Sequence, residues 1–513
     1  MAQDQEGVYK DGSFFSFNDY RLLASGSDDL HVKIWDLCGK EVHSFNSGHV
    51  NNIFSVQFLP SGQGKVILSA AGDRSVRMHS YTYSETSHVW YSDGRVKRLA
   101  VTAADPHLFW SASEDGIIRE YDTRTCASTE LLTFENKECK SLALNENRPE
   151  MLAVALNEAG VPLYDRRNVS RPLLTLIPAH IPLTDPMRSF KSLSVTHVGF
   201  NNVGNELIVN IGGEQIYIFN VFDKVEEPDA LQSLKDILTK SVPSGKNGCL
   251  CRKPTARFKK LRERAKIHFG NQDYADAIDA YSTAIAECDR LWSKGRDSQE
   301  SCAGDLCLLL SNRGASYLRR GWEGDIYACL LDTIRALKLD PDNIKAHYRI
   351  VKSLYELKQY EMAGEMLQLF KDRFPNDTSC GSLEKLLNEK RENSIKWVSN
   401  GTADYVQRLC GHCNTNTDIK EAVWFGGRDE YIAAGSDCGS LLVWERKSGV
   451  LVKAYEADKN ILNCVQPHPS SCLLATSGLE HVIRFWDVLP EVGLHIFYKI
   501  HFTFLKFCWV KLR

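Results

Sequence analysis

The residues whose types and spacing could most readily bind a metal or react are two cysteines, Cys410 and Cys413, which enclose a Gly-His pair. Two thiolates at this spacing could bind zinc or undergo redox chemistry, but a zinc ribbon needs a second such pair at a fixed distance, and the sequence has none. The chain also lacks the Gly-rich phosphate loop, the His-Glu-x-x-His zinc motif and the Gly-x-Ser-x-Gly nucleophile motif. We therefore predict a non-enzymatic protein without catalytic residues, a metal site or a cofactor.

Two Asp-x-Arg sequences are the next candidates, Asp122-Thr-Arg124 and Asp165-Arg-Arg167, and each follows a tyrosine. A guanidinium is planar and can bind a carboxylate through two parallel hydrogen bonds. One interpretation is that each arginine pairs locally with its own aspartate as an exposed turn residue. The other is that the two guanidiniums form a recognition surface on a flat face. The residues alone leave both open.

The composition fits a multidomain protein. At about 100–200 residues per domain, 513 residues predict roughly two to four domains. The 62 basic and 65 acidic residues nearly cancel, so no bulk charge recruits nucleic acid or a membrane surface. The 16 cysteines are spread thinly, the N-terminus is polar, and no apolar stretch reaches the roughly 18 residues of a membrane span. These features predict an intracellular, reduced and soluble protein.

An internal repeat positions the Asp-x-Arg sequences. It consists of an apolar strand, a Ser/Ala-Gly-Ser-Asp turn and a second strand that ends in Trp-Asp or an equivalent pair. Seven copies recur at spacings near 40–45 residues within each uninterrupted run, and they end at Asp36, Ser80, Asp122, Asp165, Asn220, Glu445 and Asp487. The pattern resembles the WD-repeat family, which implies a β-propeller of seven blades.

The WD resemblance assigns structural roles to several polar residues. In that family a Gly-His histidine, a serine or threonine, a turn aspartate and the tryptophan form a buried hydrogen-bonded network that locks each blade. His49 and Asp73 would act in blade two, and His412 and Trp444 in blade six. Cys438 stands where the sixth turn would carry its second aspartate, so an incomplete network is expected there.

A different period occupies residues 256–397. The pattern is helical with a period of 34 residues, and small and aromatic residues at set positions within each repeat, such as Ala265 and Tyr281 in the first and Ala336 in the second, resemble tetratricopeptide repeats. Three helical repeats are predicted, followed by a capping helix over 383–397. The expected organisation is blades one to five over 18–222, a linker over 223–255, the helical domain over 256–397, blades six and seven over 405–487, and an atypical apolar tail over 488–513. The helical domain is thus predicted to be inserted between two blades.

Both ends of the propeller depart from the repeat. Blade one is expected to begin at Asn18 without its first strand, and no ordinary outer strand follows Asp487. Propellers remove exposed sheet edges by closing the ring. The sequence therefore predicts either an unusual pairing of strands from the two ends or a weak seam.

The helical repeats carry a second constellation. Asn312, Lys345 and Arg349 match three positions at which chaperone-binding tetratricopeptide proteins clamp a C-terminal carboxylate, whereas the first repeat holds Arg262 and Lys266 and lacks the expected asparagine. Such a groove would hold an acidic peptide end through charge-assisted hydrogen bonds. The alternative is an ordinary solvated helix face.

The order of the domains resembles the family of WD and tetratricopeptide repeats proteins, known in insects as adipose. The Asp-x-Arg boxes also resemble those of substrate receptors of cullin-4 RING ubiquitin ligases, in which the arginine engages the ligase adaptor, itself a propeller protein. The resemblance implies such a receptor, cytoplasmic and nuclear, that restrains fat storage, with contacts to chromatin, histones and histone deacetylase. A histone-binding or corepressor scaffold that acts without ubiquitylation is the alternative function.

Overall fold

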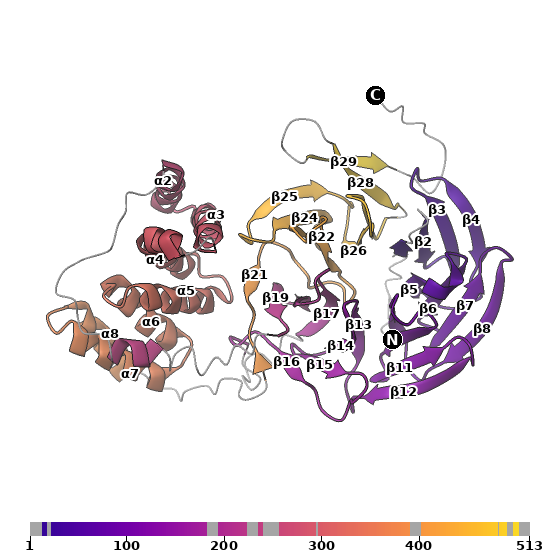
Figure 1. The fold of residues 1–513 in the computed structure, drawn as a ribbon, viewed down its shortest axis with the longest axis horizontal. Coiled ribbons are helices and arrows are strands. Elements are labelled where there is room, and N and C mark those ends of the chain that lie inside the picture. Colours follow the sequence, from indigo (N-terminus) through magenta and orange to yellow (C-terminus); the bar gives the residue numbers. More distant parts are fainter. Residues whose placement is uncertain are drawn as a thin grey trace, which may run out of the picture.

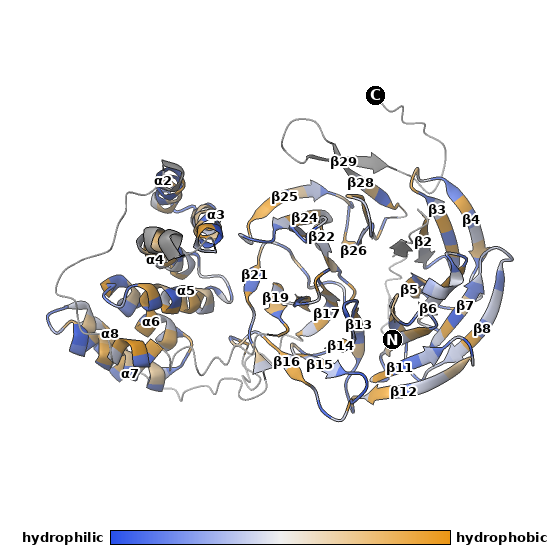
Figure 2. Cartoon of the chain, in the orientation of Figure 1, coloured by the Kyte–Doolittle hydropathy of each residue, from blue (hydrophilic) through white to orange (hydrophobic). Residues whose placement is uncertain are grey.

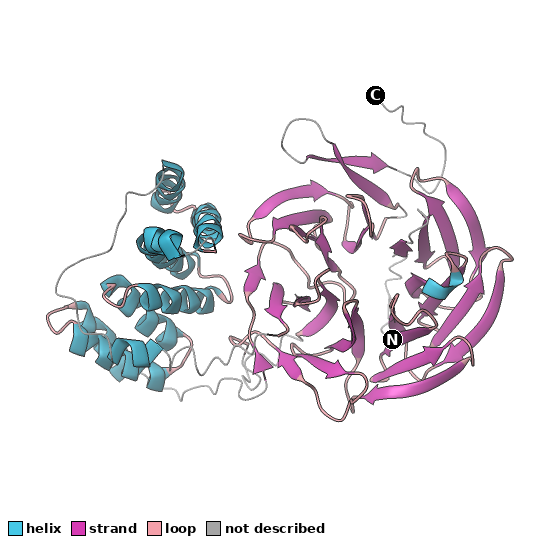
Figure 3. Ribbon diagram, viewed as in Figure 1, coloured by secondary structure: helices cyan, strands magenta, loops and turns pink. Residues whose placement is uncertain are grey.

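The sequence repeats form seven sheets of mainly antiparallel strands, and the sheets form a ring beside a stack of helices (Figure 1; Figure 3). The structure is a computed structural model, and it describes residues 13–17, 22–181, 193–222, 234–239, 256–293, 296–389, 402–480, 482–489 and 496–501. The predicted fold class, a seven-bladed β-propeller with an inserted all-α tetratricopeptide-repeat domain, is confirmed.

Blades one to four follow the chain in order. Their strands are β1 (Ser13–Phe17), β2 (Leu22–Ser27), β3 (His31–Asp36), β4 (Glu41–Asn46), β5 (Ile53–Phe58), β6 (Val66–Ala71), β7 (Ser75–Ser80), β8 (Glu85–Tyr91), β9 (Val96–Val101), β10 (Leu108–Ser113), β11 (Ile117–Asp122), β12 (Ala127–Thr133), β13 (Cys139–Asn145), β14 (Arg148–Leu156), β15 (Val161–Asp165) and β16 (Leu174–Leu176). A 3-10 turn, η1 (Pro60–Gly62), joins β5 to β6. Hydrophobic and hydrophilic residues alternate along strands such as β3 and the outer strand β4 (Figure 2).

The core of the ring lies between neighbouring blades. Ile34 and Val32 of blade one, for example, are buried against Val56 and Ile67 of blade two. Strand side chains alternate between the two faces of a sheet, so each blade offers an apolar face to both neighbours. Each interface then buries the alternate apolar residues that define the repeat.

The helical domain is inserted within blade five, so the prediction that it lies between blades five and six is wrong. Blade five contains β17 (Ser194–Phe200), β18 (Glu206–Gly212) and β19 (Ile216–Asn220), and its outer strand is β21 (Gln407–Leu409), which follows the helices in the sequence. The two-residue strand β20 (Thr402–Ala403) joins β16 of blade four in parallel. The chain therefore leaves and re-enters the propeller at adjoining blades.

The inserted domain stacks three antiparallel helix pairs and one further helix. They are α2 (Ala256–Gly270), α3 (Tyr274–Trp292), α4 (Arg296–Arg320), α5 (Asp325–Leu339), α6 (Ile344–Glu356), α7 (Tyr360–Arg373) and α8 (Ser379–Asn388). The predicted capping helix thus begins four residues early, and its predicted end, 390–397, lies outside the described residues. Residues 234–239 of the predicted linker form a short helix whose Leu234 and Leu238 are buried in the helical core. No helix in the described parts of the chain is long and apolar enough to cross a membrane.

Both ends of the propeller are more complete than the sequence predicted. β1 pairs with β2 in blade one upstream of Asn18. Blade six contains β22 (Ala422–Phe425), β23 (Tyr431–Gly435), β24 (Ser440–Glu445) and β25 (Leu451–Glu456), and blade seven contains β26 (Leu462–Pro467), β27 (Leu474–Gly478), β28 (Arg484–Leu489) and β29 (Ile496–His501). β29 is an outer strand drawn from the predicted tail.

The seam between blades one and seven is closed by packing. Neither of these two sheets borrows a strand from the other end of the chain in the described residues, so the first of the two predicted alternatives, a pairing of terminal strands, is wrong, and the weak seam stays a prediction. Leu23 and Trp35 of blade one instead pack with Cys464, Ala475 and Phe485 of blade seven. Burial of apolar side chains alone can close the ring when the first and the last blade each contain four strands.

The turn between α4 and α5 joins the helical domain to the propeller. Asp325 is fully buried. Its carboxylate accepts hydrogen bonds from Arg320 at 2.8–2.9 Å and forms an ion pair with Arg408 of β21. Arg408 also donates to the carbonyl of Glu323 at 2.5 Å. Gly324 has a φ of +78°, and a side chain there would collide with the Arg408 guanidinium, so this turn requires glycine.

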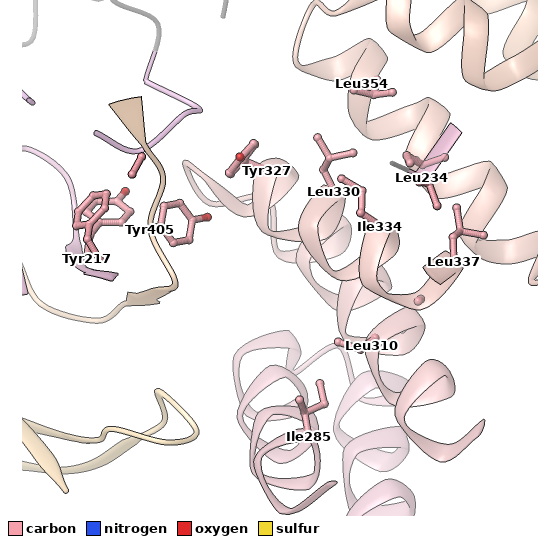
Figure 4. Close-up of a cluster of buried hydrophobic side chains, with 14 of the residues drawn as sticks. Tyr217, Leu234, Ile285, Leu310, Tyr327, Leu330, Ile334, Leu337, Leu354 and Tyr405 are labelled. Atoms are coloured by element: carbon pink, nitrogen blue, oxygen red, sulfur yellow. The ribbon is translucent and has the colours of Figure 1, made fainter. Parts of the chain in front are cut away.

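Aromatic residues extend this joint. Tyr327 of α5 donates to Asp404 at 2.9 Å, and the Asp404 carboxylate also accepts the backbone N–H of Ala179 at 2.8 Å. Tyr405 packs between Tyr327 and Tyr217, and the aliphatic core of the helices begins beside them (Figure 4). The two domains therefore share one continuous core.

We predict that Asp325→Ala destabilises the helical domain by about 3–5 kcal/mol, because two buried guanidiniums lose their carboxylate. Asp289→Ala is the control, since it removes the half-exposed pair with Arg335 and should cost less than about 1 kcal/mol. Urea unfolding followed by the helical circular-dichroism signal measures both. Equal losses in the two variants would contradict the assignment of Asp325 to the joint.

Candidate functional site

The two Asp-x-Arg boxes have the same geometry. Arg124 Nε and Nη2 donate to the two Asp122 oxygens at 3.0 and 2.7 Å, and Arg167 repeats this with Asp165 at 2.9 and 2.8 Å. The backbone N–H of each arginine also donates to the same carboxylate, at 2.9 and 3.0 Å. Local pairing, the first interpretation, therefore describes the isolated chain.

The pairing leaves both arginines exposed to a partner. Their side chains are 63% and 70% exposed, and Nη1 of each makes no hydrogen bond to a described residue. Hydrogen bonds from the Arg124 side chain and backbone lower the pKa of Asp122 to about 2, and Arg167 does the same to Asp165. The carboxylates stay ionised at any physiological pH and hold the guanidiniums in a fixed orientation.

The boxes lie on one rim of the propeller. Arg124 follows β11 and Arg167 follows β15, which are the third strands of adjacent blades, so both boxes occupy the turn to the fourth strand. Corresponding turns of neighbouring blades share a face of the ring. Arg124 and Arg167 therefore occupy corresponding positions of neighbouring blades.

Arg166, between the two boxed residues, has a structural role that the sequence interpretation missed. Its guanidinium forms an ion pair with Asp105 of blade three and donates to the Pro149 carbonyl at 2.6 Å. It also lies 4.9 Å from the Trp110 ring centroid. Arg166 therefore ties blade four to blade three and fixes the two boxes relative to each other.

The predicted basic groove is only partly assembled. Arg349 and Lys345 lie one turn apart on α6, and Arg349 Nη1 donates to Ser311 Oγ at 2.5 Å, next to Asn312 on α4. No carboxylate among the described residues forms a salt bridge with Arg349, although the side chain is half-buried. Burial lowers the pKa of this guanidinium below its usual value. A buried cation of this kind favours an anionic ligand.

The first-repeat residues do not join this group. Arg262 Nη1 lies 3.8 Å from Asp305, an acidic residue already present on α4. Lys266 pairs with Glu263 of its own helix at 2.9 Å and is exposed. The groove therefore contains one unneutralised part, around Asn312, Lys345 and Arg349, and this part remains a prediction as a binding site.

The blade-locking network is present in blade two. His49 lies 2.9 Å from Asp73 and 2.8 Å from Ser69 Oγ, and Ser69 contacts His79 at 2.7 Å. His79 occupies the tryptophan position, and its burial lowers the pKa of its imidazole to about 3. This neutral histidine completes the network as an acceptor or donor in place of an indole.

Blade six uses different partners. His412 contacts Asn210 of blade five at 3.0 Å, Trp444 donates to the Cys410 carbonyl at 2.9 Å, and Asp437 pairs with the buried Lys420 at 2.9 Å. The expected His-Asp contact is missing from the described interactions, as the substitution at Cys438 indicated.

The two cysteines of the pair lie in different surroundings. Cys410 lines an interdomain cleft of about 460 Å³, whereas the Cys413 sulfur lies 3.6 Å from Thr415. Among the described residues, only His268, Asp273 and Asp276 bring three possible ligand atoms within 4.8 Å of one another. They lie at the turn from α2 to α3, with both carboxylates exposed, and nothing further points to an ion there.

Comparison with known proteins agrees with this architecture. The family model "WD domain, G-beta repeat" matches residues 11–36, 39–80 and 449–487. The "WD and tetratricopeptide repeats protein 1" of Homo sapiens is 33% identical over 567 aligned positions, which cover 92% of this chain and 82% of that protein. The chain belongs to the WD and tetratricopeptide repeats protein family.

Two further relatives extend the comparison of this WD and tetratricopeptide repeats protein. The "Protein ALTERED SEED GERMINATION 2" of Arabidopsis thaliana is 26% identical and covers 92% of this chain and 84% of its own length. The "DDB1- and CUL4-associated factor 6" of Homo sapiens is 41% identical over 81 residues, which are 16% of this chain and 9% of that protein.

We predict that alanine substitutions of Arg124, Arg166 and Arg167 lower the free energy of unfolding by different amounts. Arg166→Ala should cost about 1–2 kcal/mol, because it removes an ion pair and a hydrogen bond that a mostly buried guanidinium makes between two blades. Arg124→Ala and Arg167→Ala should each stay within about 0.5 kcal/mol, because exposed pairs contribute little. Chemical denaturation compares them. A loss at Arg167 as large as that at Arg166 would show that the boxes stabilise the fold.

Proposed function

We propose that the chain is a non-catalytic adaptor that recruits substrate proteins to a cullin-4 RING ubiquitin ligase, with Arg124 and Arg167 contacting the ligase adaptor. The observation that carries the proposal is the repeated pair of exposed, identically oriented guanidiniums on neighbouring blades.

Preorganisation is the physical basis of the proposed contact. Binding normally costs about 0.5–1.5 kcal/mol for each flexible side chain that becomes ordered. Asp122 and Asp165 already order the two arginines, and Arg166 fixes the spacing between them. A partner that presents carboxylates or carbonyls at that spacing would bind with little further ordering.

The comparisons support this proposal at the level of the family. One relative carries DDB1 and CUL4 in its name, and it shares an 81-residue stretch with this chain. The human relative covers nearly the whole chain. Restraint of fat storage and a cytoplasmic and nuclear location stay expectations of the family resemblance. A histone-binding or corepressor scaffold is the alternative.

We predict that Arg124→Ala combined with Arg167→Ala removes ligase-adaptor binding. Loss of a buried, paired arginine from an interface typically costs about 2 kcal/mol, so two losses would weaken binding roughly a thousandfold if additive. Co-precipitation measures binding, and circular dichroism verifies the fold. Lys40→Ala is the matched control, because Lys40 is an exposed cation in the corresponding turn of blade one.

The conservative double variant to lysine sharpens the test. Lysine keeps the charge but cannot bind bidentately, so its binding should also fall. Adaptor binding that persists in a folded double-alanine variant would sink the docking assignment. Capture of histones or histone deacetylase without the adaptor would indicate the scaffold instead.

We further propose that the part of the groove around Asn312, Lys345 and Arg349 binds an acidic peptide end. The half-buried Arg349 guanidinium supports this, because a charge removed from water gains most from a carboxylate. The ligand would be a substrate or cofactor protein with an acidic C-terminus, held while the boxes contact the ligase.

We predict that Lys345→Ala weakens binding of an acidic C-terminal peptide about tenfold, the effect of one charge-assisted hydrogen bond. Lys345 is exposed, so the melting temperature should not change. Lys338→Ala on α5 is the control, since that lysine is equally exposed on the outer helix of its repeat. Fluorescence anisotropy of one labelled acidic peptide measures its affinity for each variant. Equal affinities in the two variants would contradict the peptide site and favour the alternative of a solvated helix face.

A further inference from the structure

The turn between β23 and β24 of blade six carries a cysteine where most blades carry an acid. The position lies six residues before the residue that occupies the tryptophan position of the third strand, such as Trp444 in blade six. It is occupied by Asp29, Asp73, Asp115, Glu158 and Glu480 in blades one, two, three, four and seven, by Gly213 in blade five and by Cys438 in blade six.

This turn is built to stabilise a negative charge. The residue two positions further on directs its backbone N–H at the acid: His31 to Asp29 at 2.9 Å and Ile117 to Asp115 at 3.0 Å. Blade two adds a hydroxyl, because Asp73 accepts both the N–H and the Oγ of Ser75, at 3.1 and 2.7 Å. The position therefore presents anion-stabilising donors whichever side chain stands there.

Blade six keeps hydroxyls around the cysteine. The Cys438 thiol donates to Ser436 Oγ at 3.3 Å and to Ser440 Oγ at 3.4 Å, and the same hydroxyls can rotate to donate to the sulfur once it is a thiolate. Burial raises the pKa of the thiol, but these hydroxyls and the backbone N–H of Ser440 outweigh it and lower the pKa below its usual value. The side chain is exposed to solvent. An exposed thiol among donors is the environment of a reactive cysteine.

A second exposed thiol adjoins the turn. The backbone N–H of Cys413 donates to Ser436 Oγ at 3.1 Å, and its carbonyl accepts the N–H of Asp437 at 2.9 Å. The Ser436 hydroxyl therefore contacts both cysteine residues. Cys413 and Cys438 are separated by 25 positions in the sequence. The turn that joins them through Ser436 lies on the face of the ring opposite the arginine boxes, since turns after second and third strands lie at opposite ends of antiparallel strands.

We propose that Cys438 is a peroxide-sensitive thiolate and that Cys413 is its resolving cysteine. The Cys438 thiolate attacks hydrogen peroxide, an S–O bond forms as the O–O bond breaks, and the leaving hydroxide takes a proton to become water. The Cys413 thiol then attacks the sulfenic acid, an S–S bond forms, and a second water leaves. In total, two thiols are oxidised and one peroxide is reduced to two waters.

The first experiment measures thiol reactivity in the full-length chain. Iodoacetamide labelling at pH 7, followed by mass spectrometry, should alkylate Cys438 at least about threefold faster than the exposed Cys38 and Cys472. Ser440→Ala should bring that rate down towards the rate of the two control cysteines without altering the melting temperature. A Cys438 rate equal to that of Cys38 and Cys472 would overturn the thiolate.

The second experiment tests the pairing. Low concentrations of hydrogen peroxide should give a peptide pair linked between Cys413 and Cys438, and in Cys413→Ser a dimedone adduct should accumulate on Cys438 instead. Cys438→Asp, which restores the acid of the other blades, should fold normally and give neither product. Oxidised Cys438 without a link to Cys413 would overturn the resolving role.

Discussion

The pairing of β21 with β19 is the constraint on which the arrangement of this protein depends. It completes blade five with a strand that lies beyond the helical domain, so both ends of the insertion are fixed to the propeller. Loop-closure entropy grows only slowly with loop length, and an insertion whose ends already lie together adds little further cost. The buried Asp325 then orients the inserted domain, because its carboxylate must satisfy Arg408 of that same strand.

One consequence is that the two candidate binding surfaces keep a fixed relation. The arginine boxes stand on blades three and four, and the helical domain is anchored at blades four and five. Arg166 locks the first pair of blades, and the Tyr327–Asp404 contact holds the helices to the second. Ligands bound at the two candidate surfaces would therefore be held at a set distance from each other.

The blade repeat also shows how one backbone design accepts different chemistry. The turn that holds Asp73 beside Ser75 in blade two holds Cys438 beside Ser440 in blade six. In the hydrogen-bonded network of blade two, the buried His79 replaces the tryptophan of the repeat. Blade six compensates with Lys420, which pairs with Asp437 from a segment that runs between blades five and six. The backbone bonds of the sheets carry the fold, so individual polar positions can change function without loss of the blade.

The sequence by itself determined the repeat type, the number of blades, the helical insertion and the positions of Arg124 and Arg167 in corresponding turns, because all of these depend on periods of apolar residues and turn chemistry that are local in the chain. Tertiary structure alone decided that β21 belongs to blade five, that β1 and β29 complete the end blades, and that the seam closes by packing. It also decided that Arg166 bridges two blades, that Lys266 pairs with Glu263 whereas Arg349 forms no salt bridge with a carboxylate of the described residues, and that Cys413 and Cys438 both contact Ser436. These outcomes depend on contacts between residues far apart in the sequence, whose energies appear only when the neighbouring elements are in place.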